Sequence, residues 1–218
     1  MLHPDTDLRY IGPQVGHGVV ATRRIPRGTI TWVQDRLDRV FTSEQMAAMG
    51  EPYWSILDKY TFRDAQGDHV FCWDHARYVN HSFHATCLPT VDGFELAVRD
   101  IEAGEQLTDD YGTLNLTEPF LALPEPGSRR RWVRPDDLLR HYAPWDRKLA
   151  LAFAGFAGVE QPLAYLLAPD VLERSLAVAR GERPMESIRT TYCGALEPRA
   201  RGRRVAAHRS RARQRDAP

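Results

Sequence analysis

The stretch that decides the fold of this chain reads Arg77-Tyr78-Val79-Asn80-His81-Ser82. A second informative stretch follows it and reads Gly104-Glu105-Gln106-Leu107-Thr108-Asp109-Asp110-Tyr111-Gly112. Neither contains a glycine-rich phosphate loop, a pair of zinc ligands or the nucleophile turn of a hydrolase. Each stretch is weak evidence alone, so the function has to be inferred from the order and spacing of several segments.

A third segment precedes both and reads Val15-Gly16-His17-Gly18-Val19-Val20-Ala21, then Ile25-Pro26-Arg27-Gly28-Thr29-Ile30. In this order and at these distances, the three segments resemble those of the SET-domain protein lysine methyltransferases. The resemblance covers residues 1–113. It implies an α+β class with a β-rich SET fold, in which small sheets surround a signature strand threaded through a loop like a pseudoknot. Such threading is an exception to the usual rule for chain connections.

The composition is that of an ordinary soluble globular protein, with 43% hydrophobic and 27% charged residues. No apolar run is long enough to span a bilayer, and the N-terminus lacks the apolar core of a secretory signal. Cys72, Cys87 and Cys193 form no close pair, which disfavours both a disulfide framework and a zinc half-site. We therefore expect a cytoplasmic protein that does not contact membranes. The excess of arginine over lysine suggests a biased, bacterial genome.

We expect four segments along the chain. Residues 1–113 form the SET domain, 114–131 a connector rich in Pro and Arg, 132–197 a helical C-terminal region and 198–218 a disordered basic tail. The tail contains one large aliphatic residue, Val205, and cannot bury enough apolar surface to offset the entropy of ordering. It either makes weak contacts with a polyanion or nucleic acid, or it is a solvated terminus without a partner.

Local patterns predict several elements. Asp64–Asp68 should be the turn of a hairpin, and Ser43–Met49 a short helix capped by Thr42 or Ser43. In the second half, four helices are expected from proline and acidic starts and a glycine stop: Pro135–Tyr142, Trp145–Phe156, Pro162–Leu167 and Pro169–Arg180, the last ended by Gly181.

The resemblance implies that S-adenosyl-L-methionine is the cofactor. Gly16, His17 and Gly18 alone would suggest a turn or bulge, but in the family the backbone here contacts the methionine part of the cofactor. The resemblance implies that the Asn80 side chain binds the amino group of the cofactor, because an amide oxygen accepts hydrogen bonds from an ammonium. It also implies that the His81 backbone contacts the adenine edge. Arg77 is either a further cofactor contact or a structural arginine.

Tyr111 is the predicted catalytic residue, although a lone tyrosine before glycine is usually an anchoring aromatic. In the family, a neutral lysine amine attacks the methyl group of a sulfonium, and the tyrosine hydroxyl helps to orient the amine. The positive sulfonium and desolvation both lower the pKa of the amine, so no general base is required. Tyr111 should also contact the cofactor.

Many SET enzymes carry a zinc cluster built from a cysteine after the Asn-His-Ser motif and from a cysteine-rich tail. Here Phe83 follows Ser82, and residues 120–129 contain no cysteine, so we predict no metal. Closing the pocket would then fall to Phe120, Trp132 or the helices beyond.

A second departure from the family is Asp109, which occupies the place of an aromatic residue that tunes the number of methyl groups added. Strand alternation predicts that Asp109 and Tyr111 line one substrate channel while Asp110 faces away. This arrangement favours mono- or dimethylation. Alternatively, the strand bends and Asp109 caps a turn at the surface.

The sequence thus predicts an S-adenosylmethionine-dependent protein lysine N-methyltransferase that acts on a lysine-bearing protein or peptide. No chromatin-reading module is visible, so histones are not favoured over other proteins. Two alternatives stay open: a catalytically silent SET-fold binding module, and a nucleic-acid-associated protein whose tail dominates its function.

Overall fold

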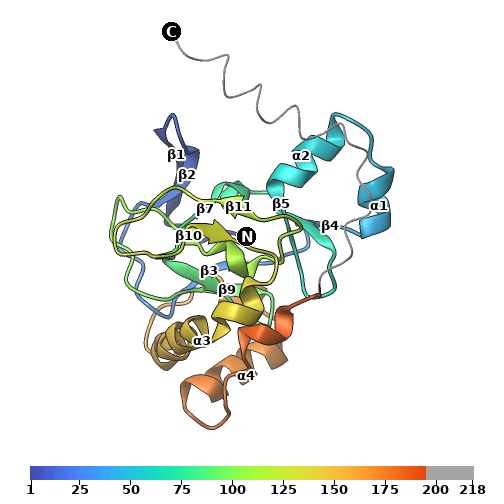
Figure 1. Ribbon diagram of the computed structural model, residues 1–218. Coiled ribbons are helices and arrows are strands. Elements are labelled where there is room, and N and C mark those ends of the chain that lie inside the picture. Colours follow the sequence, from blue (N-terminus) through green and yellow to red (C-terminus); the bar gives the residue numbers. More distant parts are fainter. Residues whose placement is uncertain (195–218) are drawn as a thin grey trace.

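The computed structural model describes residues 1–194 (Figure 1). The predicted basic tail, residues 198–218, lies outside the described residues. Its centre is a five-stranded sheet with the order β3-β9-β8-β10-β7. The strands are β3 (Ile30–Val33), β7 (Asn80–His81), β8 (Cys87–Pro89), β9 (Phe94–Ala97) and β10 (Thr108–Asp109). The pairs β3–β9 and β8–β9 are antiparallel, whereas β10 runs parallel to both of its neighbours.

Strand β10 is inserted between two strands that precede it in the chain. The Ser82 amide donates to the Asp109 carbonyl at 2.9 Å on one side, and the Thr86 amide donates to the Thr108 carbonyl at 3.0 Å on the other. This insertion brings the two signature stretches side by side. It is the topology that the family resemblance implies for the threaded strand.

Three smaller sheets surround the central one. They are the hairpin β1 (Thr6–Gly12) and β2 (Gly16–Ala21), the three-stranded sheet of β4 (Arg39–Phe41), β5 (Thr61–Arg63) and β6 (His69–Phe71), and the pair β11 (Phe120–Leu121) and β12 (Trp132–Val133). The antiparallel β5–β6 pair confirms the predicted hairpin. The β11–β12 pair was not foreseen, because the connector between residues 114 and 131 reads as irregular.

Two short helices lie on the side of the molecule away from the C-terminal helices (Figure 1). Helix α1 (Ser43–Ala48) confirms the prediction, and Thr42 is its N-cap in a reciprocal capping box with Gln45. Helix α2 (Tyr53–Tyr60) was not foreseen, and Leu57 is its one buried side chain.

The C-terminal region corrects two predictions, of which the first concerns Pro144. The segments expected as two helices around Pro144 form one helix, α3 (Asp137–Phe156). A proline inside a helix removes one hydrogen bond, but a buried apolar stripe runs from Leu138 before Pro144 to Trp145, Leu149 and Phe153 after it. Burial of this stripe favours a continuous helix over a break.

Two further segments follow α3. Residues 162–167, expected as a helix, contain only the 3-10 turn Ala164–Leu166. Helix α4 (Pro169–Ala179) agrees with the prediction, and Gly181 after it has a φ of +73°, the left-handed conformation that glycine adopts at helix ends.

The main core lies between the central sheet and these helices, which cover one face of the sheet (Figure 1). It joins strand residues such as Leu88 and Phe94 to helix residues such as Leu149 and Phe156. Gly28 allows a close approach here, since a Cβ atom on it would lie 2.6 Å from the Ala152 carbonyl oxygen. The helical layer is thus packed directly onto the β-rich half. Among residues 1–194, none of the helices is both long and apolar enough to cross a membrane.

Candidate active site

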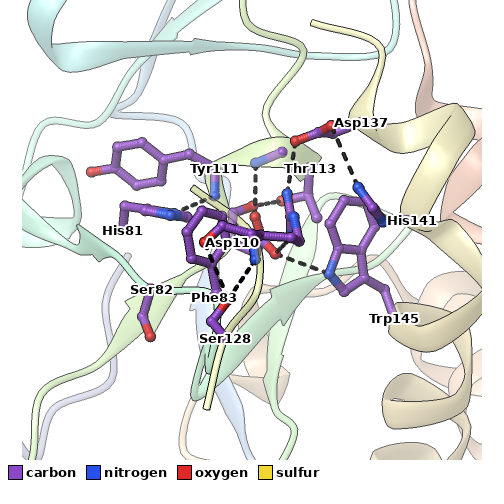
Figure 2. A network of polar contacts seen from close by, with 12 residues as sticks. His81, Ser82, Phe83, Asp110, Tyr111, Thr113, Ser128, Asp137, His141 and Trp145 are labelled. Carbon is purple, nitrogen blue, oxygen red and sulfur yellow. Dashed lines mark hydrogen bonds and ion pairs between the residues drawn. The ribbon is translucent and has the colours of Figure 1, made fainter. Parts of the chain in front are cut away.

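Tyr111 is fixed at both ends by the first signature stretch. It follows β10 directly and opens a short 3-10 helix (Tyr111–Thr113). Its amide donates to His81 Nδ1 at 3.2 Å, and its hydroxyl donates to the Val79 carbonyl at 2.6 Å. Figure 2 shows the Tyr111 and His81 side chains next to each other.

The Tyr111 phenol is held in its neutral form. Burial raises its pKa, and the nearby carboxyl groups of Asp109 and Glu95 raise it further. Because its one hydrogen is donated to Val79, the oxygen lone pairs are free to accept from an incoming donor. A neutral acceptor of this kind can orient an amine.

Asn80 lies beside the hairpin that carries Gly16, His17 and Gly18. Its Nδ2 donates to the His17 carbonyl and to Gln106 Oε1, both at 3.1 Å. A Cβ atom on Gly18 would lie 2.6 Å from Asn80 Nδ2, so only glycine permits this approach. Both described bonds of the Asn80 side chain use its nitrogen, which leaves its oxygen available to accept from a ligand.

The structure thus brings together three predicted cofactor contacts and a fourth residue, Gln106, that the sequence did not single out. The backbone carbonyl of His17 accepts from Asn80, while its ring makes edge contacts with Tyr10 and Tyr78.

Arg77 makes a different set of contacts. Its Nη1 donates to the carbonyls of Cys72, Trp73 and Asp74, at 3.2, 2.7 and 2.8 Å. These bonds hold the turn that precedes Asn80. Of the two interpretations of Arg77, its contacts favour the structural one.

Tyr111 also lines a cavity of about 380 Å³. Its aromatic walls include Trp32 and Phe62, whose rings meet edge to face at 5.8 Å, and Phe120, which meets Tyr111 in the same way at 6.2 Å. Of the residues expected to close the pocket, Phe120 is therefore one that lines this cavity. Trp132 is 44% exposed and is not part of the cavity wall.

Asp109 also lines this cavity and is only 5% exposed. The alternative in which Asp109 caps a turn at the surface is therefore wrong. Its Oδ1 atom has no hydrogen-bond partner in the protein, and neither has Nε1 of Trp32 in the same cavity. Buried polar atoms are nearly always paired, so this unpaired acceptor and donor point to a polar occupant.

Glu95 is the site residue that sequence reasoning missed. It lies on β9, lines the cavity, and burial raises its pKa to about 7. Burial and the neighbouring Glu95 and Asp110 also raise the pKa of Asp109 well above its usual range. The available signal was a glutamate within the apolar run Phe94–Val98, where a charged residue needs a reason.

Asp110 faces away from the cavity, as predicted, into a polar network (Figure 2). Its Oδ1 accepts from the Gly112 amide at 3.1 Å, and its Oδ2 accepts from Trp145 Nε1 at 3.2 Å and from Arg130. Arg130 also donates to Asp137 at 2.7 Å, so one guanidinium joins the signature strand to the start of α3.

The connector is tied to the first signature stretch by Glu125. Its carboxylate accepts from the Ser82 hydroxyl and the Phe83 amide, both at 3.0 Å, and from the His84 amide at 3.3 Å. These bonds hold the connector against residues 82–84. Within residues 1–194, no three His, Cys, Asp or Glu side chains are grouped so that they could hold a metal ion.

Comparison with known proteins agrees with this geometry. Residues 16–112 match the family model of the SET domain. This match spans the Gly16–Ala21 segment and both signature stretches that contain Asn80 and Tyr111. Among solved structures, it is similar to a Plasmodium falciparum protein assigned as a histone methyltransferase, with 13% identity and a TM-score of 0.37 over 50% of this chain and 95% of the other. No curated protein matches the sequence.

Proposed function

We propose that this protein is an S-adenosylmethionine-dependent protein lysine N-methyltransferase with Tyr111 as its catalytic residue. The observation that carries the proposal is that Tyr111 is hydrogen-bonded to Val79 and His81, the two neighbours of Asn80, and also lines the cavity that contains Asp109 and Glu95. Cofactor and substrate could then approach from opposite sides and meet at one hydroxyl.

The residues on the first side fit the cofactor. The open backbone at Gly18 and the available oxygen of Asn80 suit a ligand that carries an ammonium group. S-adenosylmethionine would supply an electrophilic methyl group. The backbones of Gly16, His17 and His81 are the further contacts that we assign to it.

On the cavity side, the chain would bind and orient the lysine. The aromatic walls exclude water from the alkyl part of the lysine side chain and contribute hydrophobic contacts. The Tyr111 oxygen can accept an N–H of the neutral amine and so fix the direction of the nitrogen lone pair. Orientation of this kind can lower the barrier without a separate nucleophile in the protein.

The substrate class is a protein or peptide with an accessible lysine. The experiment that tests the proposal incubates the protein with methyl-labelled cofactor and a cell lysate, and then locates the label by mass spectrometry. Label on lysine side chains is the expected result. A protein that binds the cofactor but transfers no label would instead support the silent binding module.

Cofactor binding is tested separately with Asn80→Ala. Loss of a hydrogen bond to a charged group should weaken binding of S-adenosylmethionine by about 1.5–3 kcal/mol, measured by calorimetry. Gln45→Ala serves as a control, because the exposed Gln45 side chain contacts Thr42 at the start of α1 and takes no part in the Asn80 site. Equal affinity of Asn80→Ala and wild type would contradict the assignment of Asn80.

A further inference from the structure

The cavity beside Tyr111 contains two carboxyl groups on one face of the central sheet. In the pairing register, Asp109 lies opposite Cys87, and Glu95 lies opposite Pro89 and Trp32. Cys87 and Pro89 are two residues apart on β8, so they and their cross-strand partners point to the same face. Asp109, Glu95 and Trp32 therefore project together into the cavity that they line.

This carboxyl pair is built to receive a ligand. Asp109 is only 5% exposed, and its Oδ1 has no protein partner. The cavity volume of about 380 Å³ is within the usual range for small-ligand sites. The aromatic rings around it can attract a cation through their faces.

Resting on the proposed function, we propose that Glu95 and Asp109 together bind the ammonium group of the substrate lysine and accept its proton before methyl transfer. In this step an N–H bond of the ammonium breaks and an O–H bond forms on the carboxyl pair. The nitrogen keeps the electron pair and becomes the neutral amine that Tyr111 orients. The proton leaves to solvent after the product departs.

The charges around the pair suit this role. Burial and the nearby Glu95 both raise the pKa of Asp109, so ionisation of the two carboxyl groups together is disfavoured near neutral pH. Glu95 has its pKa raised to about 7, close to the pH at which a proton acceptor works best. A lysine ammonium has an ordinary pKa near ~10.4, and the cationic cofactor beside it would lower that value.

Other titratable and charged groups also face the pair. Asp110 raises the pKa of Asp109, and the amino group of Met1 lowers that of Glu95. The thiols of Cys72 and Cys87 and the phenol of Tyr111 have pKa values raised by burial, so they stay neutral. The cavity wall also includes Asp58, Lys59, Arg77 and Glu118.

The binding half of the proposal is tested without cofactor or methyl transfer. The probe is n-butylammonium, titrated into wild type, Glu95→Gln and Asp109→Asn at about pH 8 and followed by NMR, with n-butanol as the uncharged probe of equal length. We expect wild type to prefer the cation and each variant to bind it at least tenfold more weakly. Glu173→Gln, an exposed carboxylate on α4, should bind like wild type.

Equal affinity of all four proteins for n-butylammonium, or no binding by wild type, would overturn the proposal. Both substitutions nearly preserve side-chain shape, and circular dichroism with thermal unfolding checks that each variant is folded. Carboxylate-dependent binding in a protein that transfers no methyl group would contradict the proposed function and leave the cation site standing. The two failures are therefore distinguishable.

The proton-transfer half is tested by the pH dependence of methyl transfer. In wild type the rate should rise with pH up to about 7 and then level off, following the acceptor. In Glu95→Gln the rise should move to higher pH by about one unit or more, towards the pKa of lysine itself. An unchanged pH profile in Glu95→Gln would show that Glu95 accepts no proton.

Discussion

Asp109 and Asp110 are neighbours at the end of β10, and their carboxyl groups lie in opposite environments on its two sides. On one side, both oxygens of Asp110 are satisfied by Gly112, Arg130 and Trp145. On the other, Asp109 is almost as deeply buried, yet its Oδ1 has no protein partner and it faces a cavity shared with Glu95. Satisfied buried charges hold elements together, whereas an unsatisfied one costs stability and is retained at sites that bind something.

The largest expected effect is on the satisfied side. Arg130→Ala would leave Asp110 and Asp137 buried without their shared guanidinium, so the free energy of unfolding should fall by about 3–5 kcal/mol. Chemical denaturation measures this change. The neighbouring Arg131 is exposed, and Arg131→Ala should stay within about 0.5 kcal/mol of wild type. Similar losses for both arginines would contradict the structural role of Arg130.

The second prediction compares the two aspartates directly. Asp110→Asn removes the charge that Arg130 binds and should lower the free energy of unfolding by about 1.5–3 kcal/mol. Asp109→Asn replaces a buried carboxyl group whose Oδ1 has no partner and should cost no stability, or should stabilise the protein at about pH 8. Denaturation of the two variants side by side provides the measurement. If Asp109→Asn is the more damaging change, the two sides have been assigned wrongly.

The third prediction concerns the pH dependence of stability through Glu95. Its pKa is raised from 4.5 to about 7 in the folded protein, so the folded state binds this proton more tightly than the unfolded state. The contribution of Glu95 to stability is therefore lost as pH rises from about 4.5 to about 7, and it stays lost above that.

Glu95→Gln does not titrate and should escape this loss. Relative to wild type, it should gain about 2 kcal/mol in the free energy of unfolding between about pH 5 and pH 8. Denaturation at both pH values measures the gain. A constant difference between the two proteins would mean that Glu95 has an ordinary pKa in the folded state.

Features of the fold and the site that depend on residues close together in the sequence could be predicted, whereas those that depend on distant segments could not. The Thr42 cap and the Asp64–Asp68 turn are local, and both were predicted correctly. The signature stretches pointed to the SET domain because their order is distinctive, and residues 16–112 match the model of that domain. The break predicted near Pro144 was wrong, because burial of a long apolar stripe outweighs one lost hydrogen bond.

The parts that sequence reasoning missed depend on pairing between distant segments. Glu95 reaches the cavity only because β9, β8 and β10 are adjacent in the sheet, which the strand sequences alone do not specify. Arg130 is one of three consecutive arginines, and nothing local distinguishes it from its neighbours. The predicted roles of the cofactor contacts, the cytoplasmic location and the basic tail stay predictions.

The central claim is that Tyr111 is the catalytic residue at the junction of the two sides. Tyr111→Phe removes one hydroxyl and its bond to Val79, and the ring can keep its contacts with His81 and Phe120. The most direct measurement is transfer of labelled methyl groups to lysine by wild type and variant, with cofactor affinity measured in parallel. We predict that turnover falls at least a hundredfold while affinity and folding are preserved. Wild-type turnover in Tyr111→Phe would contradict the account.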